Sequence, residues 1–299
     1  MQTFCTTQRL QLIRLDQGDA PFILELLNTE AWKKFIGDRN VTSINEASSY
    51  IQKIEATSSV SYWTVKLKDT SASIGVITFI KRDYLNYHDI GFAFLPQYSK
   101  LGYAYEATMG ALAALSTTYT SPEIVATTLA ENTNSIQLLQ KLGFSYKNEI
   151  THENDKLRLF SISTECCKLD KLCFDFYSLF TCSATLQHRV NELYQLCLPN
   201  ASFENTTLNR NEMLTLTEFI DSRHTILSNG SYTSFEEYEL SRTISLDSSS
   251  AIRFSSYEKR GIRNGSVFFD KGVKQFHYKK TSYGWKIEKV SWCDEVLKS

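Results

Sequence analysis

The spacing of apolar and polar residues in the first half of the chain predicts a mixture of helices and strands. Apolar residues recur at helical spacing over residues 19–36 and 44–56, which predicts two amphipathic helices. Short apolar or alternating runs predict strands between and after these helices. The predicted strands cover residues 61–68, 73–81, 88–95, 124–130, 144–150 and 157–163. This half of the chain is therefore expected to fold as a mixed α+β domain.

The second half of the chain begins with helical spacing and ends with long alternating strands. Residues 172–197 predict a long amphipathic helix, and residues 210–227 predict a second helix that stops before Gly230. The strands predicted after it cover residues 232–246, 250–258, 267–280 and 284–294. They exceed the usual length of about 5–6 residues, as expected of a curved sheet that wraps around a helix. The apolar parity changes between Ile287 and Val290, which predicts a β-bulge in the last strand.

A domain boundary is predicted where these two patterns meet. Residues 164–171 turn polar and contain neither Pro nor Gly, so they predict a short linker of limited flexibility. A chain of 299 residues also exceeds the usual size of one domain. The predicted domains therefore span residues 1–165 and 170–299.

Composition and charge exclude several classes of function. The net charge is −1 and Lys and Arg do not cluster, so no nucleic-acid partner is expected. No apolar run approaches the ~18 residues of a membrane helix, so no membrane association is expected. The chain has seven cysteines, no Cys-x-x-Cys spacing and five scattered histidines, so no metal site is expected. We expect a cytoplasmic protein with reduced thiols.

The segment after the strand at residues 88–95 has the features of a phosphate-binding turn. The chain breaks the apolar pattern there, and Ala104, Ala107 and Ala111 then mark the face of a helix. N–H groups in the first turn of a helix have no acceptor within the helix and lie at the positive end of its dipole. Such groups bind phosphate well. A strand, loop and helix in this order predict an anion-binding cradle, although the arrangement occurs in many folds.

A second segment follows the strand at residues 124–130. Asn132, Asn134 and Ser135 are each suited to cap a short helix, along which apolar residues recur. Gly143 is suited to end that helix in the left-handed conformation. The segment therefore predicts a short capped helix followed by another strand.

Together, the two segments resemble the GNAT acyl-CoA N-acyltransferases. The first reads Pro-x-Tyr-x-x-x-Gly-Tyr-Ala, and the second reads Glu-Asn-x-x-Ser-x-x-Leu-Leu-x-Lys-Leu-Gly-Phe. Residues 7–15 and 37–39 also resemble the branch typified by the ribosomal-protein N-terminal acetylating enzymes, so the resemblance covers residues 1–163. It implies a mixed central sheet flanked by helices. It also implies transfer of an acetyl group from acetyl-CoA to a small-molecule or peptide amine. Because no cysteine lies in either motif, we expect the amine to attack the thioester directly, without a covalent enzyme intermediate.

The resemblance implies which residues hold the cofactor. The implied set is Phe92, Phe94, Lys100, Leu101, Gly102, Tyr103, Ala104 and Asn132. The main chain of Phe92 and Phe94 would pair with the pantetheine arm, with one N–H facing the thioester oxygen. Gly102 permits close approach of the backbone to the pyrophosphate. Lys100 stands where the family frequently has Gly, so weaker binding and a loop that does not bind are both left open.

The resemblance also suggests catalytic residues. Asp89 is the candidate base, because it lies on the strand that carries the cofactor, where the family often has an acidic residue. The alternative is a structural hydrogen bond or ion pair between Asp89 and a neighbouring loop. His88 is the reserve base, with its side chain expected on the opposite face of the strand. Many members use a tyrosine as the acid where this chain has Leu139. Ser135 is therefore the candidate acid, with a purely capping role as its alternative.

Residues 170–295 resemble the SnoaL-like cone fold of the nuclear transport factor superfamily, with a helix first and long strands ending Gly-Trp-Lys-Ile-x-x-Val-x-Trp. This looser resemblance implies a second α+β domain, a curved antiparallel sheet around a helix, that binds a ligand or forms a homodimer. The candidate polar residues of its pocket are His188, Glu237, Glu239 and Arg253. Two rival functions stay open. One is a non-catalytic acyl-CoA or small-molecule binding protein, and the other is isomerase- or hydratase-type chemistry in this second domain.

Overall fold

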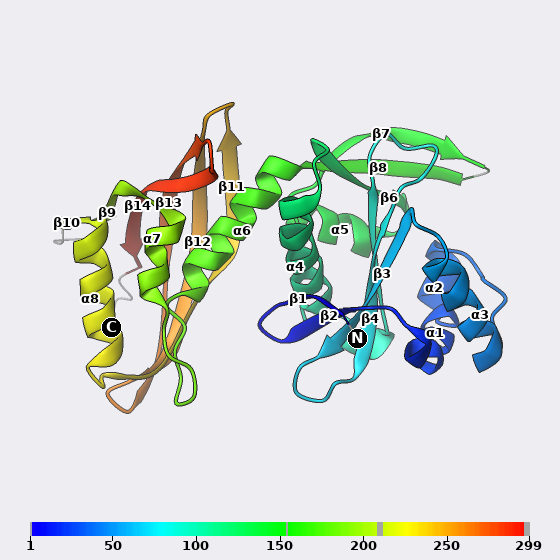
Figure 1. Ribbon diagram of the computed structural model, residues 1–299, viewed down its shortest axis with the longest axis horizontal. Helices are drawn as coiled ribbons and strands as arrows, with labels where there is room; N and C mark the ends of the chain where they lie inside the picture. The colour runs from blue at the N-terminus through cyan, green and yellow to red at the C-terminus, as the bar shows by residue number, and fades with distance from the viewer. Residues whose placement is uncertain (1, 154, 208–211, 296–299) are drawn as a thin grey trace. The chain divides into compact units, whose positions relative to one another are not determined.

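The computed structural model describes residues 2–153, 155–207 and 212–295 (Figure 1). The chain divides into two compact units, Met1–Cys167 and Lys168–Ser299. The boundary falls inside helix α6 (Thr164–Ser178), so the segment predicted as a polar linker is helical. Because residues 164–171 contain neither Pro nor Gly, nothing in them interrupts a helix. Both units contain helices and strands, which confirms the predicted α+β class.

Within the described residues, the first unit holds a sheet of eight strands in the order β1-β2-β3-β4-β5-β6-β8-β7. The strands are β1 (Thr3–Thr6), β2 (Leu10–Arg14), β3 (Val60–Leu67), β4 (Ser73–Ile80), β5 (Asp89–Phe94), β6 (Glu123–Leu129), β7 (Ser145–His152) and β8 (Asp155–Ser163). Neighbouring strands are antiparallel except β5 and β6, which are parallel. Every strand predicted in this half is present, and the sheet is mixed as predicted.

Helices pack on both faces of this sheet. They are α1 (Ala20–Leu27), α2 (Glu30–Phe35), α3 (Ile44–Glu55), α4 (Tyr103–Thr118) and α5 (Thr133–Lys141), with short 3-10 helices η1 (Gln17–Asp19) and η2 (Pro96–Tyr98). Helices α1–α3 share a core with Val76, whereas α4 and α5 share another core with Ile77 on the opposite face. The helix predicted over residues 19–36 is divided in two. Thr29 Oγ1 accepts the Trp32 N–H at 3.2 Å and begins α2.

The second unit holds a sheet of six strands, among the described residues, in the order β10-β9-β14-β13-β12-β11. The strands are β9 (Cys197–Asn205), β10 (Glu212–Thr215), β11 (Tyr232–Leu246), β12 (Ser250–Arg263), β13 (Ser266–Thr281) and β14 (Gly284–Asp294). His277 pairs with Lys289 and Tyr278 pairs with Ile287, so Glu288 is the extra residue of a bulge in β14. The predicted bulge is confirmed.

Helices α6 and α8 (Leu216–Ser228) bury their apolar faces against this second sheet. Phe176 of α6 and Phe219 of α8 lie in the same core as Phe276 of β13. The short helices η3 (Val190–Glu192) and α7 (Leu193–Leu196) precede β9. No helix in the described part of the chain is both long and apolar enough to cross a membrane.

The prediction of one helix over residues 172–197 is wrong for most of that range. Helix α6 ends at Ser178, and the chain then forms a loop and two short helices before strand β9. Phe180, Val190 and Leu193, which fit the helical spacing, are buried in the core without belonging to one helix. Their burial depends on the sheet, which local spacing does not reveal.

The helix predicted over residues 210–227 also begins later than expected. Strand β10 occupies Glu212–Thr215, and α8 begins after it, where the Thr215 side chain caps the helix. The first two residues of the predicted helix, 210 and 211, lie outside the described residues.

Candidate functional site

Main-chain groups at the end of β5 face alternately toward β4 and away from it. The Leu95 N–H donates to the Ile74 carbonyl at 2.9 Å. Main-chain bonding alternates along an antiparallel pair, so Gly91 and Ala93 also bond to β4. The N–H and C=O groups of Phe92 and Phe94 therefore face the other side, where β6 is the next strand.

Strand β6 leaves β5 before it reaches these groups. In the described part of the chain, β5 and β6 are paired only at Asp89 and Val125. The Val125 N–H donates to the His88 carbonyl at 3.0 Å. The next N–H that faces β5, that of Thr127, donates instead to Asp89 Oδ1 at 3.1 Å. Phe92 thus lies beyond the paired part of the two strands, beside an opening in the sheet.

The loop from Ser99 to Gly102 leads from this opening to the start of α4. Lys100 has φ of 60° and Gly102 has φ of 81°, so both lie in the left-handed region. Gly102 is the N-cap of α4, and the first-turn N–H groups of Tyr103 and Ala104 have no acceptor within the helix. A side chain costs roughly 1–2 kcal/mol in this conformation, which explains why Gly would be favoured at position 100.

Arg9, from the turn between β1 and β2, joins this loop. Its Nη1 donates to the Leu101 carbonyl at 3.1 Å, and its Nε donates to Glu106 at 2.6 Å. The guanidinium group lies 4.4 Å from the centre of the Tyr103 ring. Sequence reasoning missed Arg9 because its contacts cross more than ninety residues. Lys100 and the ion pair of Arg9 with Glu106 thus lie near the start of α4.

The start of α5 is capped by Asn132. Its Oδ1 accepts the Ser135 N–H at 3.2 Å, so Ser135 is not the cap and lies in the first turn. The Ser135 side chain is half-buried, and its hydroxyl has no hydrogen-bond partner within the described residues. Leu139, at the position where a catalytic tyrosine would be expected, is buried in the core. Gly143 follows the helix with φ of 89°, as predicted.

Asp89 is buried and has a partner on each carboxylate oxygen. Only 4 % of it is exposed. Oδ2 accepts from Arg82 Nε at 2.5 Å, while Oδ1 accepts from Thr127. Burial raises the pKa of Asp89 more than these two neighbours lower it. This geometry supports the structural alternative predicted for Asp89.

His88 and Tyr84 both precede Asp89 in the sequence, and their rings stack on other aromatic residues. The His88 ring stacks on Phe79 at 4.7 Å, and its Nδ1 lies 3.2 Å from the Tyr119 hydroxyl. Burial lowers the pKa of His88. Tyr84 stacks on His152 of β7 at 3.7 Å, so the loop between β4 and β5 is anchored on that strand.

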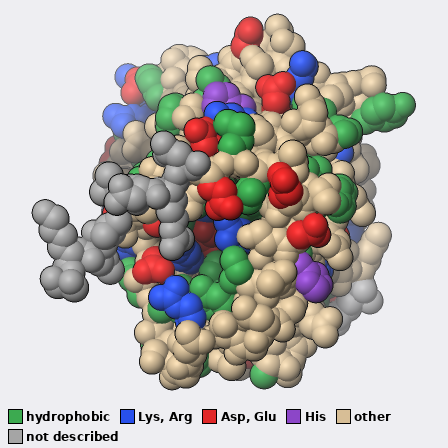
Figure 2. All heavy atoms as spheres, turned by 90° about the vertical axis from the view of Figure 1, so that its left-hand side faces the viewer, with side chains coloured by type: hydrophobic (Ala, Val, Ile, Leu, Met, Phe, Trp, Pro, Cys, Tyr) green, Lys and Arg blue, Asp and Glu red, His purple; other side chains and the backbone are tan. Residues whose placement is uncertain are grey.

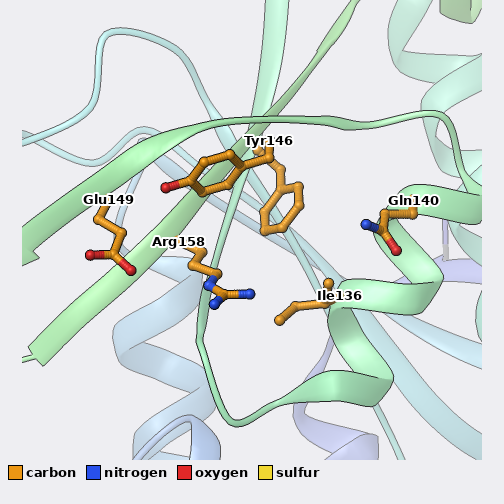
Figure 3. A pocket seen from close by; sticks show the side chains of 6 residues that line it. Ile136, Gln140, Tyr146, Glu149 and Arg158 are labelled. Carbon is orange, nitrogen blue, oxygen red and sulfur yellow. The ribbon is translucent and has the colours of Figure 1, made fainter.

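A separate depression of about 340 Å³ lies between α5 and the strands β7 and β8 (Figure 3). It is lined by Ile136, Gln140, Tyr146, Glu149, Arg158 and Phe160. Figure 3 shows Ile136 and Gln140 reaching it from α5, with Tyr146 and Arg158 on the opposite side. None of the predicted site residues lines this depression, so it is distinct from the opening beside β5.

The polar residues predicted for the second unit fall into separate groups. Arg253 is 1 % exposed and pairs with Asp170 at 2.7 Å and with Glu239. Glu237 pairs with the buried Lys274. His188 bonds to Ser228 instead. On one face of this unit, acidic, basic and apolar side chains are interspersed (Figure 2).

A strand edge that opens beside a helix N-terminus is suited to an extended ligand that carries phosphate. Residues 9–145 match a family model described as the acetyltransferase (GNAT) domain. This part of the chain is therefore similar to the acetyltransferase domains of the GNAT family.

Individual relatives are similar to the same half of the chain. An uncharacterized N-acetyltransferase, YnaD of Bacillus subtilis, is 28 % identical over 138 residues, which cover 46 % of this chain and 80 % of the relative. A GNAT-family acetyltransferase structure from Bacillus anthracis is 23 % identical with a TM-score of 0.47, covering 54 % of this chain and 98 % of its own. The structure of a spermidine N-acetyltransferase from Vibrio cholerae, in complex with CoA and spermine, is 19 % identical with a TM-score of 0.47. The match covers 53 % of this chain and 98 % of the Vibrio cholerae chain.

Proposed function

We propose that the first unit transfers an acetyl group from acetyl-CoA to an amine. The observation that carries this proposal is the continuity between the free edge of β5 and the cradle at α4. The main chain of Phe92 and Phe94 offers donors and acceptors to an extended arm that carries amides of its own. The N–H groups of residues 101–104 then receive the pyrophosphate at the start of the helix. The GNAT family match is consistent with this division of roles.

Three side chains complete the cofactor site in this proposal. Lys100 lies at the rim of the cradle, and Arg9 adds charge beside Tyr103. The Asn132 oxygen is used in the helix cap, so its amide nitrogen is the part that contacts the pantetheine arm. No metal is needed, because the helix N-terminus and these cations stabilise the phosphate charge.

We further propose that the amine attacks the thioester directly. No cysteine lies in the two motifs, and burial raises the pKa of the Cys5 thiol to about 12. A thiol with so high a pKa is a poor nucleophile at neutral pH. As the C–N bond forms and the C–S bond breaks, the amine loses a proton to water and the CoA thiolate gains one. Ser135 is the proposed proton donor, directly or through water, and it regains its proton from water. Its half-buried hydroxyl lies in the first turn of α5. The acceptor is the amine of a small molecule or of a peptide N-terminus.

The second unit is proposed to be a SnoaL-like domain that binds a ligand or a second copy of the chain. Its long strands and the packing of α6 on their buried face support this assignment. The charged groups in its interior are paired with one another, which favours binding or structural roles over catalysis.

Release of free CoA thiol in the presence of a panel of amines tests the proposed reaction. Gly102→Asp is the matched variant, because it adds a negative charge at the cradle and a side chain at φ of 81°. Gly265→Asp is its control, since Gly265 has φ of 77° and open space around it in the second unit. We expect Gly102→Asp to abolish turnover and Gly265→Asp to retain it. Calorimetry that detects no acetyl-CoA binding to the unaltered chain at millimolar concentration would refute the proposal.

A further inference from the structure

We propose that Asp89 is a positioning residue that holds β5 and β6 apart, so that the edge of β5 can receive acetyl-CoA. This inference rests on the proposed function, because the opened edge needs an acyl-CoA ligand to occupy it. A positioning residue acts through the main chain and takes no proton from the amine. The proposal therefore replaces the role of general base that the sequence suggests for Asp89.

The first argument is the interrupted hydrogen-bond ladder. The Val125 N–H donates to the carbonyl of His88, the residue before Asp89, at 3.0 Å. In a continuing parallel ladder, the next donor of β6 would bond to the carbonyl of Ile90. Thr127 bonds to the Asp89 carboxylate at 3.1 Å instead. The side chain thus takes the place of a main-chain acceptor at the step where the strands separate.

The second argument is that the Thr127 N–H, which makes a part-buried hydrogen bond, needs an acceptor. A buried backbone donor without a partner is strongly disfavoured. If Asp89 supplied none, the Thr127 N–H would regain a partner by pairing with Ile90. That pairing would draw the strands to the usual spacing of about 4.8 Å and close the edge at Phe92. The Asp89 carboxylate therefore accepts the Thr127 N–H of β6 and leaves the main-chain groups at the edge of β5 open to a ligand.

The third argument is that Asp89 is itself held in place. Arg82 donates to its second oxygen at 2.5 Å, which offsets the burial of a negative charge. Arg82 belongs to the loop between β4 and β5, which is fixed by the stacking of Tyr84 on His152. The two carboxylate oxygens therefore link that loop to β6 through hydrogen bonds with Arg82 and Thr127.

Two substitutions of similar size separate positioning from base catalysis. Asp89→Asn removes the titratable group but keeps an oxygen that accepts the Thr127 N–H. Asp89→Leu removes both. Since Arg82 is partly exposed, it reaches solvent in either variant. The KM for acetyl-CoA, kcat and the pH profile of kcat are measured for both variants and for the unaltered chain. Exchange of the Thr127 amide is measured without ligand.

Positioning predicts that Asp89→Leu has a KM for acetyl-CoA about 10-fold above that of Asp89→Asn. The Thr127 amide should stay protected from exchange in Asp89→Leu, because it pairs with Ile90. It also predicts that Asp89→Asn keeps the shape of the pH profile, with a modest increase in KM. If both variants lose kcat equally, by about 100-fold or more, and the acidic limb disappears, Asp89 is a base and the inference is wrong.

The outcomes also separate this inference from the proposed function. Acetyl-CoA turnover by the unaltered chain, combined with equal losses in both variants, overturns the inference alone. No acetyl-CoA binding by the unaltered chain overturns both. If Asp89→Leu does not fold, the pH profile of Asp89→Asn decides the question by itself.

Discussion

Replacing Lys100 separates two contributions of one residue, its charge and its backbone conformation. Lys100 is exposed and has φ of 60°. Lys100→Ala removes the charge and keeps a side chain in the left-handed region. Lys100→Gly removes the charge and the conformational cost together. Comparing Ala with Lys therefore reports the charge, and comparing Gly with Ala reports the backbone.

The expected magnitudes follow from these differences. A side chain in the left-handed region costs roughly 1–2 kcal/mol of stability, and Gly avoids this cost. Gly in turn lowers stability by about 0.5–1 kcal/mol, because it loses more conformational freedom on folding. Lys100→Gly should therefore be more stable than Lys100→Ala by about 0.5–1 kcal/mol. One exposed charge near a phosphate is worth about 1 kcal/mol at a separation of 4 Å, which is about a 5-fold change in Kd.

Denaturant unfolding and calorimetry with acetyl-CoA measure the two effects. We expect Lys100→Ala to raise the Kd about 5-fold, and the difference to shrink at high salt because the charge is screened. Equal stability of the Ala and Gly variants would refute the conformational argument. An unchanged Kd in Lys100→Ala would show that the charge does not contribute to binding.

Three further predictions concern other parts of the chain. Asp170→Asn should lower the free energy of unfolding by about 3–5 kcal/mol, because it leaves the buried Arg253 short of a partner; urea denaturation measures this. Burial lowers the pKa of Lys274 to about 8, so from about pH 8 to 10 the unfolded chain holds a proton that the folded chain has lost. Melting curves should therefore show stability rising with pH over that range, relative to Lys274→Met. Ser135→Ala should lower kcat about 100-fold in the thiol-release assay, and the exposed control Thr133→Ala should not.

Local features of the fold could be predicted from the sequence. The start of α4 at Tyr103, the stop at Gly143 and the bulge between Ile287 and Val290 all follow from patterns within a few residues. The cofactor residues of the loop were predicted from the motifs, and they stay predictions until a ligand is tested. Strand β9, in contrast, was missed because its parallel pairing with β14 joins distant segments.

The long-range contacts of the site residues could not be predicted from the sequence. Arg9 and Glu106 meet through the packing of β2 on α4, and no local pattern brings them together. The partner of Asp89 on β6 is Thr127, which has no signature of its own. Such contacts depend on strand order, which the sequence pattern leaves undetermined.

The central claim is that acetyl-CoA lies along the opened edge of β5 and ends at the start of α4. NMR of the amide groups during an acetyl-CoA titration tests it most directly. We predict that the amide signals of Phe92, Phe94 and residues 101–104 shift, while those of Gly91 and Ala93, which bond to β4, shift little. Shifts that leave Phe92 and Phe94 unaffected, or that gather around the depression at Tyr146, would contradict the claim.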